Sequence, residues 1–172
     1  MSLLTSSPTI AFIALGSNMG DSENILRHAI EQLATFSTQP LLKSSLWQTS
    51  PVDCPPGSPP FVNAVVGLAP RAGETPESLL GKLQQLEKDS GRKARLVVNE
   101  PRRLDLDLIC FGRETRAAAA LTLPHPRAHV RRFVLQPLAE IAPDLILPGQ
   151  KSSVAKLLAS LATRETLLRL ER

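Results

Sequence analysis

The sequence predicts an α+β fold, with a largely antiparallel sheet, two main helices on one face and a candidate active-site cleft on the other. Two observations support this prediction. Apolar runs and amphipathic stretches follow one another in the order strand–helix–strand–strand–helix–strand, which is the split βαβ pattern. Residues 102–112 alternate apolar and charged side chains with a period of two, which is typical of a strand whose two faces differ.

The composition fits one domain over residues 1–172. The chain is 42% hydrophobic and 21% charged, and its net charge of +4 suits an anionic ligand. Aromatic residues make up only 3%, which argues against a sheet that stacks nucleic-acid bases. No apolar run approaches the roughly 20 residues of a membrane helix, and no signal peptide is visible. Cys54 and Cys110 show neither disulfide nor metal spacing, which favours a reducing cytoplasm.

The first part of the chain predicts two strands and a helix. Residues 10–15 form a continuous apolar run that ends in Gly16-Ser17-Asn18, as expected for a central strand and a tight loop. A helix follows Asp21, a favourable N-cap, and has an apolar face over residues 25–33. Residues 41–49 predict a second strand. The loop over 50–60 holds five prolines, which exclude both helix and strand ladder.

The second part begins with a third strand over residues 61–68. Thr75 and Pro76 give a strong helix start, and Gly91 ends that helix. A basic loop over 92–101 precedes the alternating strand. Beyond it we expect a short extended piece over 121–126, a short helix around 131–135 and a closing amphipathic helix over about 152–170.

Two carboxylates share one face of the alternating strand. Asp105 and Asp107 are two residues apart, so their Cα atoms lie about 6.5 Å from each other on the face opposite to the leucines. Aspartate is depleted in strands, and a hard divalent cation such as Mg²⁺ takes oxygen ligands of this kind. The alternative is that the aspartates lie on the solvated face of an antiparallel strand. For this strand by itself, that alternative is favoured about two to one over metal binding.

Two further groups of residues could contact a ligand. Asn63 is disfavoured on a strand, so its amide should have a dedicated partner, either the edge of a heterocycle stacked near Phe61 or a neighbouring loop. His125 stands in a basic stretch that would suit a polyphosphate, or that could form a solvated basic face. The other members of that stretch are Arg127, His129, Arg131 and Arg132.

An ordered set of motifs then points to one family. They are Ala-Leu-Gly-Ser-Asn at 14–18, Thr-Ser-Pro-Val at 49–52, Phe-Val-Asn-Ala-Val at 61–65, Leu-Glu-x-x-x-Gly-Arg at 86–92, Pro-Arg-Arg-Leu-Asp-Leu-Asp-Leu at 101–108, Leu-Pro-His-Pro at 123–126 and Arg-x-Phe-Val-Leu at 131–135. In these motifs the chain resembles hydroxymethyl-dihydropterin pyrophosphokinase, an enzyme of folate biosynthesis. The resemblance covers a core over residues 10–148.

The resemblance implies a ferredoxin-like sandwich and a transferase activity. Such an enzyme moves pyrophosphate from ATP to the hydroxymethyl group of 6-hydroxymethyl-7,8-dihydropterin and leaves AMP. ATP would be the co-substrate, and two Mg²⁺ ions would be held by Asp105 and Asp107. The implied partners are small molecules, with no nucleic acid and no membrane, and the implied state is a cytoplasmic monomer.

The resemblance also assigns roles to residues around the two substrates. The implied catalytic residues are Arg92, Arg102, Asp105 and Asp107. The implied ATP-binding residues are Gln84, Glu87, Arg102, Leu108, Thr122, His125 and Arg131. The implied pterin-binding residues are Thr49, Pro51, Val52, Phe61, Asn63 and Phe133, with the two phenylalanines on either side of the pterin ring.

The chain departs from many members of that family at a few positions. Asn99-Glu100 replaces Trp-Gly, Pro126 replaces a Tyr and Ala94 stands where some members have a second loop Arg. These changes bear on how the loop closes over ATP. Two rival functions are a ferredoxin-like nucleic-acid-binding module and another two-metal nucleotide enzyme. The shortage of aromatics weighs against the first, and the His-Pro and Arg-x-Phe motifs together with Asn63 weigh against the second.

Overall fold

The fold is described from a computed structural model of the chain, over residues 7–51, 54–91 and 103–170. Its elements, in order, are β1 (Ala11–Ser17), α1 (Ser22–Ala34), β2 (Leu42–Lys43), β3 (Trp47–Thr49), β4 (Phe61–Leu68), α2 (Pro76–Asp89), β5 (Asp105–Phe111), β6 (Arg116–Ala117), β7 (Thr122–Leu123), a 3₁₀ turn (Ala128–Val130), α3 (Arg132–Ile141), α4 (Val154–Ser160) and β8 (Leu167–Arg169).

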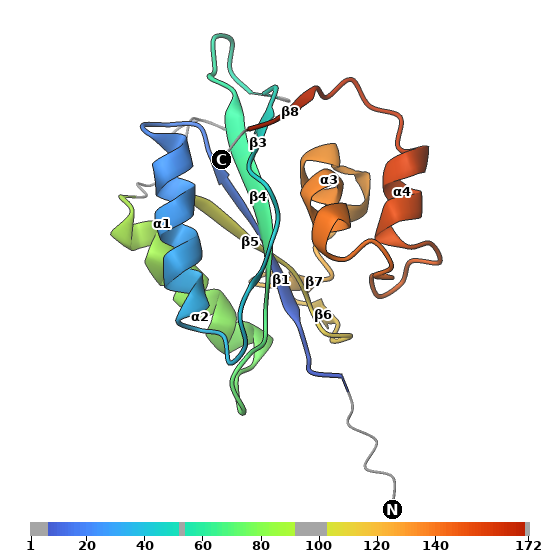
Figure 1. The fold of residues 1–172 in the computed structure, drawn as a ribbon. Helices are drawn as coiled ribbons and strands as arrows, with labels where there is room; N and C mark the ends of the chain where they lie inside the picture. Colours follow the sequence, from blue (N-terminus) through green and yellow to red (C-terminus); the bar gives the residue numbers. More distant parts are fainter. Residues whose placement is uncertain (1–6, 52–53, 92–102, 171–172) are drawn as a thin grey trace, which may run out of the picture.

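The main sheet has the strand order β5-β1-β4-β3-β8, and its paired strands are antiparallel (Figure 1). Strand β2 also pairs with β4, and β6 pairs with β7 in a separate small ribbon. The strand that comes last in the split βαβ pattern, β5, lies beside β1, and β4 fills the position on the other side of β1. The predicted antiparallel α+β sheet is therefore confirmed.

One face of the sheet is covered by α1 and α2 (Figure 1). Alternate residues of the strands point to this side, among them Leu15 of β1 and Ala64 of β4, and pack against Leu26 and Leu83 of the helices. The three leucines that alternate with the aspartates belong to the same buried cluster, and they are Leu104, Leu106 and Leu108. The predicted apolar side of the alternating strand is thus confirmed.

The opposite face is only half open, which corrects the expectation of a face left free for a ligand. Helices α3 and α4 cover one end of it (Figure 1), where Leu135 and Leu138 pack with Phe12, Val65 and Ile109 of the strands. The strands β1 and β4 are apolar on both faces, and such strands are buried on both sides. At the other end the strands carry Asn63, which is buried, and Asp105 and Asp107, which are half-buried.

The starts of the two main helices follow the predicted local chemistry. The Asp21 side chain accepts a hydrogen bond from the backbone N–H of Asn24, and Thr75 forms a reciprocal capping box with Ser78. Pro76 occupies the first turn of α2, where its missing N–H costs nothing. These caps determine where each helix begins.

Two predicted elements were wrong in extent. The expected second strand is split into β2 and β3, because the Ser44 hydroxyl accepts the Val65 N–H at 2.9 Å and interrupts the regular ladder. The expected closing helix over 152–170 ends at Ser160, and the chain then adds β8 to the edge of β3. The β-branched Thr163 and Thr166 and the unfilled edge of β3 favour the extended conformation there.

The remaining sequence expectations concern the cysteines and membranes. Cys110 is buried, and burial raises the pKa of its thiol to about 11, so it stays protonated. Within the described ranges, the helices are too short or too polar to cross a bilayer.

Candidate active site

A row of three residues crosses the sheet at its open end. Gly16 of β1 pairs with Asn63 of β4 on one side and with Asp105 of β5 on the other. Residues directly opposite in antiparallel strands point to the same face. The Asn63 amide and the Asp105 carboxylate therefore lie on either side of Gly16, and the Cα atoms of Asn63 and Asp105 are about 10 Å apart. The same face carries Asp107, which is paired with Ala14. Small residues on β1 therefore leave a shallow floor between the polar groups.

Gly16 is required by this packing. A Cβ atom at this position would lie 2.9 Å from the Asn63 Oδ1 atom and 3.8 Å from Cδ1 of Phe61. The first of these distances is shorter than Cβ contacts allow, so a side chain at residue 16 would push the Asn63 amide aside. The sequence predicted that Gly16 begins a tight loop, but it lies within β1 (Ala11–Ser17). The sequence feature that could have indicated its role beside Asn63 is a glycine at the end of an otherwise apolar central strand.

The two aspartates fit a hard cation. Both side chains are half-buried on β5 and point away from the α1 and α2 layer, because their neighbours along the strand face those helices. Mg²⁺ is commonly held by one or two carboxylates together with substrate phosphates and water, so a cage of three or more protein ligands is not needed. Within the part of the chain that the structure describes, no such larger cluster of acidic, histidine or cysteine ligands exists.

A buried carboxylate of α2 holds the strand between the two aspartates. Glu87 is only 3% exposed, and its Oε1 atom accepts the backbone N–H of Leu106 at 2.8 Å. Leu106 lies between Asp105 and Asp107, so this bond fixes the segment that presents both carboxylates. The placement gives Glu87 a contact with the strand backbone, whereas the resemblance implies a contact with the nucleotide.

A pocket of about 250 Å³ lies on the Asp107 side of the site. Four of the residues implied for metal or ATP binding line it together, namely Asp107, Leu108, Thr122 and His125. The Leu108 side chain itself belongs to the core beneath α1 and α2, so its contribution to the pocket comes mainly from the backbone. Gln84 is exposed on α2, and neither it nor Glu87 is among the pocket's lining residues.

His125 stands at the junction between this pocket and the basic stretch. Burial lowers the pKa of its imidazole, the nearby Arg131 and Arg127 lower it further, and Asp105 acts in the opposite direction. Its Nδ1 atom accepts the backbone N–H of Arg127 at 3.2 Å. The neutral ring therefore carries its proton on Nε2, which can donate to an anionic oxygen.

The other side of the site is formed by β3, the start of β4 and the first turn of α3. The Asn63 amide donates to the Thr49 hydroxyl at 2.7 Å, and both residues are buried. Phe61 is half-buried beside Gly16. Phe133 is half-buried in α3, with the Arg131 guanidinium 5.3 Å from the centre of its ring. Arg131 thus links the basic stretch to the aromatic side.

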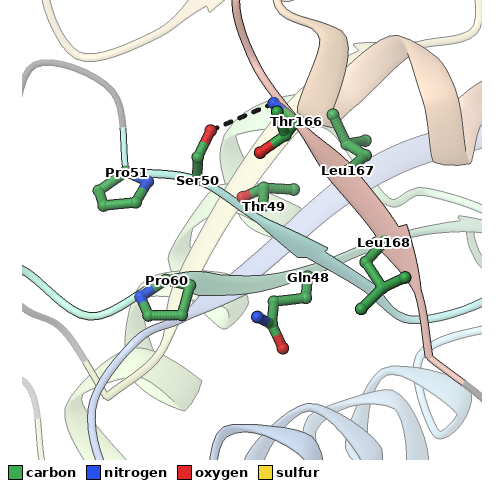
Figure 2. Close-up of a pocket in the computed structure, with 8 residues that line it drawn as sticks. All are labelled: Gln48, Thr49, Ser50, Pro51, Pro60, Thr166, Leu167 and Leu168. Atoms are coloured by element: carbon green, nitrogen blue, oxygen red, sulfur yellow. Dashed lines mark hydrogen bonds between the residues drawn. The ribbon is translucent and has the colours of Figure 1, made fainter.

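Thr49 and Pro51 also line a second pocket, of about 320 Å³, at the end of β3 (Figure 2). Its remaining walls come from Gln48, Ser50 and Pro60 and from the C-terminal residues Thr166, Leu167 and Leu168. The C-terminal contribution was not anticipated from the sequence, since that region was expected to be helical.

Some predicted site residues lie outside the described residues. They are Val52, Arg92 and Arg102, and the three loop positions at which the chain departs from the family pattern, Ala94, Asn99 and Glu100, lie there as well.

Comparison with known proteins gives a consistent result. A sequence model of the family described as 7,8-dihydro-6-hydroxymethylpterin-pyrophosphokinase (HPPK) matches residues 12–143. The chain is 42% identical over 133 residues to the 2-amino-4-hydroxy-6-hydroxymethyldihydropteridine pyrophosphokinase of Bacillus subtilis, covering 77% of each protein. It is 38% identical to the enzyme of the same name from Haemophilus influenzae, covering 82% of this chain and 86% of that protein.

Longer proteins contain a similar region. The chain is 36% identical over 144 residues to the folic acid synthesis protein fol1 of Pneumocystis carinii, but spans only 19% of its length. It also superposes on a crystal structure described as HPPK-DHPS in complex with substrates, with a TM-score of 0.69 and 11% identity, over 90% of this chain and 43% of the other. At that identity the superposition shows the fold alone, which in these domains is ferredoxin-like.

Proposed function

Since the chain belongs to the family of 7,8-dihydro-6-hydroxymethylpterin-pyrophosphokinases, we propose that it transfers pyrophosphate from ATP to 6-hydroxymethyl-7,8-dihydropterin in folate biosynthesis. The products are AMP and the pterin diphosphate. The observation that carries the proposal is the row of Asn63, Gly16 and Asp105 across three strands. It sets a group able to pair with a heterocycle beside a group able to hold a metal–phosphate complex, with only a glycine between them.

The pterin occupies the side of Asn63 in this proposal. The amide and Thr49 form hydrogen bonds with the polar edge of the ring, and Phe61 and Phe133 cover its two faces. Aromatic faces and a buried amide are suited to a flat heterocycle, because stacking supplies affinity and the amide fixes the orientation. The hydroxymethyl group then points across Gly16 toward the carboxylates.

The triphosphate of ATP occupies the side of the aspartates. Asp105 and Asp107 would hold Mg²⁺, which when bound offsets the negative charge of the phosphates and of the transition state. His125 donates from Nε2 to a phosphate oxygen, and Arg131 adds a cationic contact beside the pterin. Arg92 and Arg102 are assigned to the phosphates by their positions in the family motifs alone.

The chemistry is one displacement at phosphorus. The pterin hydroxyl oxygen forms a bond to the β-phosphorus, the bond from that phosphorus to the oxygen of AMP breaks, and the hydroxyl proton is released. The residues of the site act by holding the two reactants in line and by stabilising charge, which together account for most of the catalysis of phosphoryl transfer. No covalent intermediate on a side chain is required.

We also propose two Mg²⁺ ions, a monomer and a cytoplasmic location. The two separate carboxylates support the ion number. Sedimentation of the protein with and without substrates tests the monomer. A titration of activity against free Mg²⁺ tests for a second ion, since a single-site dependence at saturating ATP would contradict it.

The activity itself is tested by product analysis. Incubation with ATP, Mg²⁺ and the pterin alcohol should give AMP and pterin diphosphate in equal amounts. No AMP should form when the pterin is left out. Formation of ADP with a pterin monophosphate would overturn the proposal, because it would show attack at the γ-phosphorus. A variant of the exposed Asp144, Asp144→Asn, is the matched control for the Asp107→Asn variant, which should give no AMP.

A further inference from the structure

Helix α3 is joined to the segment that begins β3 through the carboxylate of Glu140, near the end of the helix. Its Oε2 atom accepts the Ser45 hydroxyl at 2.9 Å, and its Oε1 atom accepts the indole N–H of Trp47. The backbone N–H of Ser45 adds a longer bond, at 3.3 Å from Oε1. One carboxylate on α3 therefore accepts hydrogen bonds from two residues, Trp47 at the start of β3 and Ser45 just before it.

The strand side of this junction continues to residues assigned to the pterin. Trp47 and Thr49 are two apart on β3, so their side chains point to the same face of the sheet. Trp47 is also paired directly with Asn63 of β4, and the Asn63 amide donates to the Thr49 hydroxyl at 2.7 Å. The indole that Glu140 holds is thus a neighbour of both polar groups on the pterin side.

The helix side continues to Phe133. Glu140 and Phe133 are seven residues apart in α3, which is close to two turns, so both lie on the same side of the helix. Leu135 and Leu138 pack α3 onto the sheet, but apolar contacts are non-directional and do not fix its position along the strands. Hydrogen bonds are directional, so those of Glu140 determine where the helix lies relative to β3.

A further partner of the carboxylate contributes less. The Nη2 atom of Arg169 in β8 lies 3.9 Å from Glu140 Oε2, and the side chains are 66% and 25% exposed respectively. Ion pairs that are this long and exposed add little, whereas hydrogen bonds to a charged acceptor from a buried residue such as Ser45 are among the stronger ones. The connection therefore runs mainly from α3 to the segment that begins β3.

We propose that Glu140 is a positioning residue that sets the spacing between Phe133 on α3 and the polar pair Thr49 and Asn63 on the sheet. This inference rests on the proposed function, because it assigns the space between them to the pterin. Glu140 acts through the helix and the strand, and not through contact with a substrate. When the spacing is set in advance, a flat ring binds without first having to order the helix.

Kinetics of the full chain test the proposal. In Glu140→Ala the KM for the pterin should rise about tenfold, because the ring must then hold α3 in place and the loss of a hydrogen bond to a charged group has about this effect. The KM for ATP should stay within about twofold, since the residues that line the pocket beside Asp107 come from neither α3 nor β3. An unchanged KM for the pterin, or equal increases in both KM values, would overturn the proposal.

Three variants serve as comparisons. Asp144→Ala removes an exposed carboxylate just beyond α3, and Arg169→Ala removes the long ion pair but leaves the bonds of Ser45 and Trp47 to Glu140. Both should keep the KM for the pterin within about twofold of the wild type. Glu140→Gln keeps an acceptor for the indole N–H, so its KM should lie between those of the wild type and Glu140→Ala. It also provides the measurement if Glu140→Ala does not fold.

A double-mutant cycle tests whether the effect passes through the indole. Trp47→Phe removes the N–H that Glu140 accepts, so it should raise the KM for the pterin as well. The double variant should have a KM no higher than that of Glu140→Ala, because the same bond cannot be lost twice. Increases that multiply would show that the two residues act independently, which contradicts the proposed route.

Nuclear magnetic resonance supplies a readout independent of activity. Trp47 is the only tryptophan of the chain, so its indole N–H gives a single signal. In Glu140→Ala this proton should exchange faster with water, and the backbone signals of Phe133 and Asn63 should shift. Shifts confined to residues 45–47 and 139–141 would show a local role only and refute the positioning role. A wild-type protein that forms no AMP would overturn the proposed function, while the extent of the shifts would still decide whether Glu140 spaces α3 from the sheet.

Discussion

At the scale of single residues, Gly16 separates the two halves of the candidate site. Replacing it by alanine places a methyl group 2.9 Å from Asn63 Oδ1, so the amide must move. We expect kcat/KM for pyrophosphate transfer to fall about 100-fold, the usual consequence of misplacing a reactant by about 1 Å. Gly81→Ala on α2 is the matched control, since its added methyl group meets open space and should leave activity unchanged. Equal activity of the two variants would contradict the assignment.

The acidic pair makes a second prediction at this scale. Asp107→Asn keeps the shape of the side chain but removes the charge that holds a cation, so turnover should fall by at least about 100-fold. The far-ultraviolet circular dichroism and the melting temperature should stay close to those of the wild type, because the side chain is half-exposed at the open end of the sheet. Near-normal turnover at saturating Mg²⁺ would remove Asp107 from the metal site.

His125 makes the stability of the fold depend on pH. Its pKa is lowered in the folded protein by burial and by Arg131 and Arg127. The unfolded chain therefore binds a proton more readily, and the free energy of unfolding should decrease as pH falls below about 6.5, the ordinary pKa of histidine. His125→Asn should remove part of this decrease between pH 7 and 5, and the same change at the exposed His28 should leave it in place. Urea unfolding at several pH values measures both.

At the scale of elements, α2 supports the strand that carries the aspartates. Glu87→Ala leaves the buried N–H of Leu106 without its acceptor, which should lower the free energy of unfolding by about 1–3 kcal/mol. Activity should fall as well, because Leu106 lies between the two carboxylates. Glu87→Gln keeps an acceptor and should lose less of both. Gln85→Ala, at an exposed position of the same helix, is the control, and an equal loss there would show a general effect on α2.

Elements with strong local signals were predictable from the sequence. Strand β4 begins and ends where its apolar run does, and α2 begins at the Thr75 and Pro76 signal. The acidic strand was placed correctly because alternation of side chains determines its two faces. Elements whose form depends on distant partners were not. Leucines at helical spacing continue past Leu161, yet the edge of β3 and the two threonines turn that segment into β8.

The same distinction applies to the candidate site. The residue types that bind metal, phosphate and heterocycle could be predicted, because their chemistry follows from single side chains in motifs. The pairing of Gly16 with both Asn63 and Asp105 could not, since it depends on the register of three strands far apart in sequence.

At the scale of the whole molecule, the sheet works as a platform with unequal faces. Helices α1 and α2 cover one face, and α3 and α4 cover half of the other, so the polar ends of three strands are left at the open part (Figure 1). The sequence predicted the first layer from helical periodicity. It did not predict the second layer of helices. Strands that are apolar on both faces are compatible with helices on the second face, but also with a small pocket there.

The central claim is that the pterin hydroxyl attacks the β-phosphorus of ATP directly across this open face. It is tested most directly with a pterin substrate whose hydroxymethyl oxygen carries ¹⁸O, followed by phosphorus-31 spectroscopy of the products. We predict that the label stays in the bridge between carbon and phosphorus of the pterin diphosphate, with AMP unlabelled. Loss of the label from that bridge, or ADP as the nucleotide product, would contradict the account.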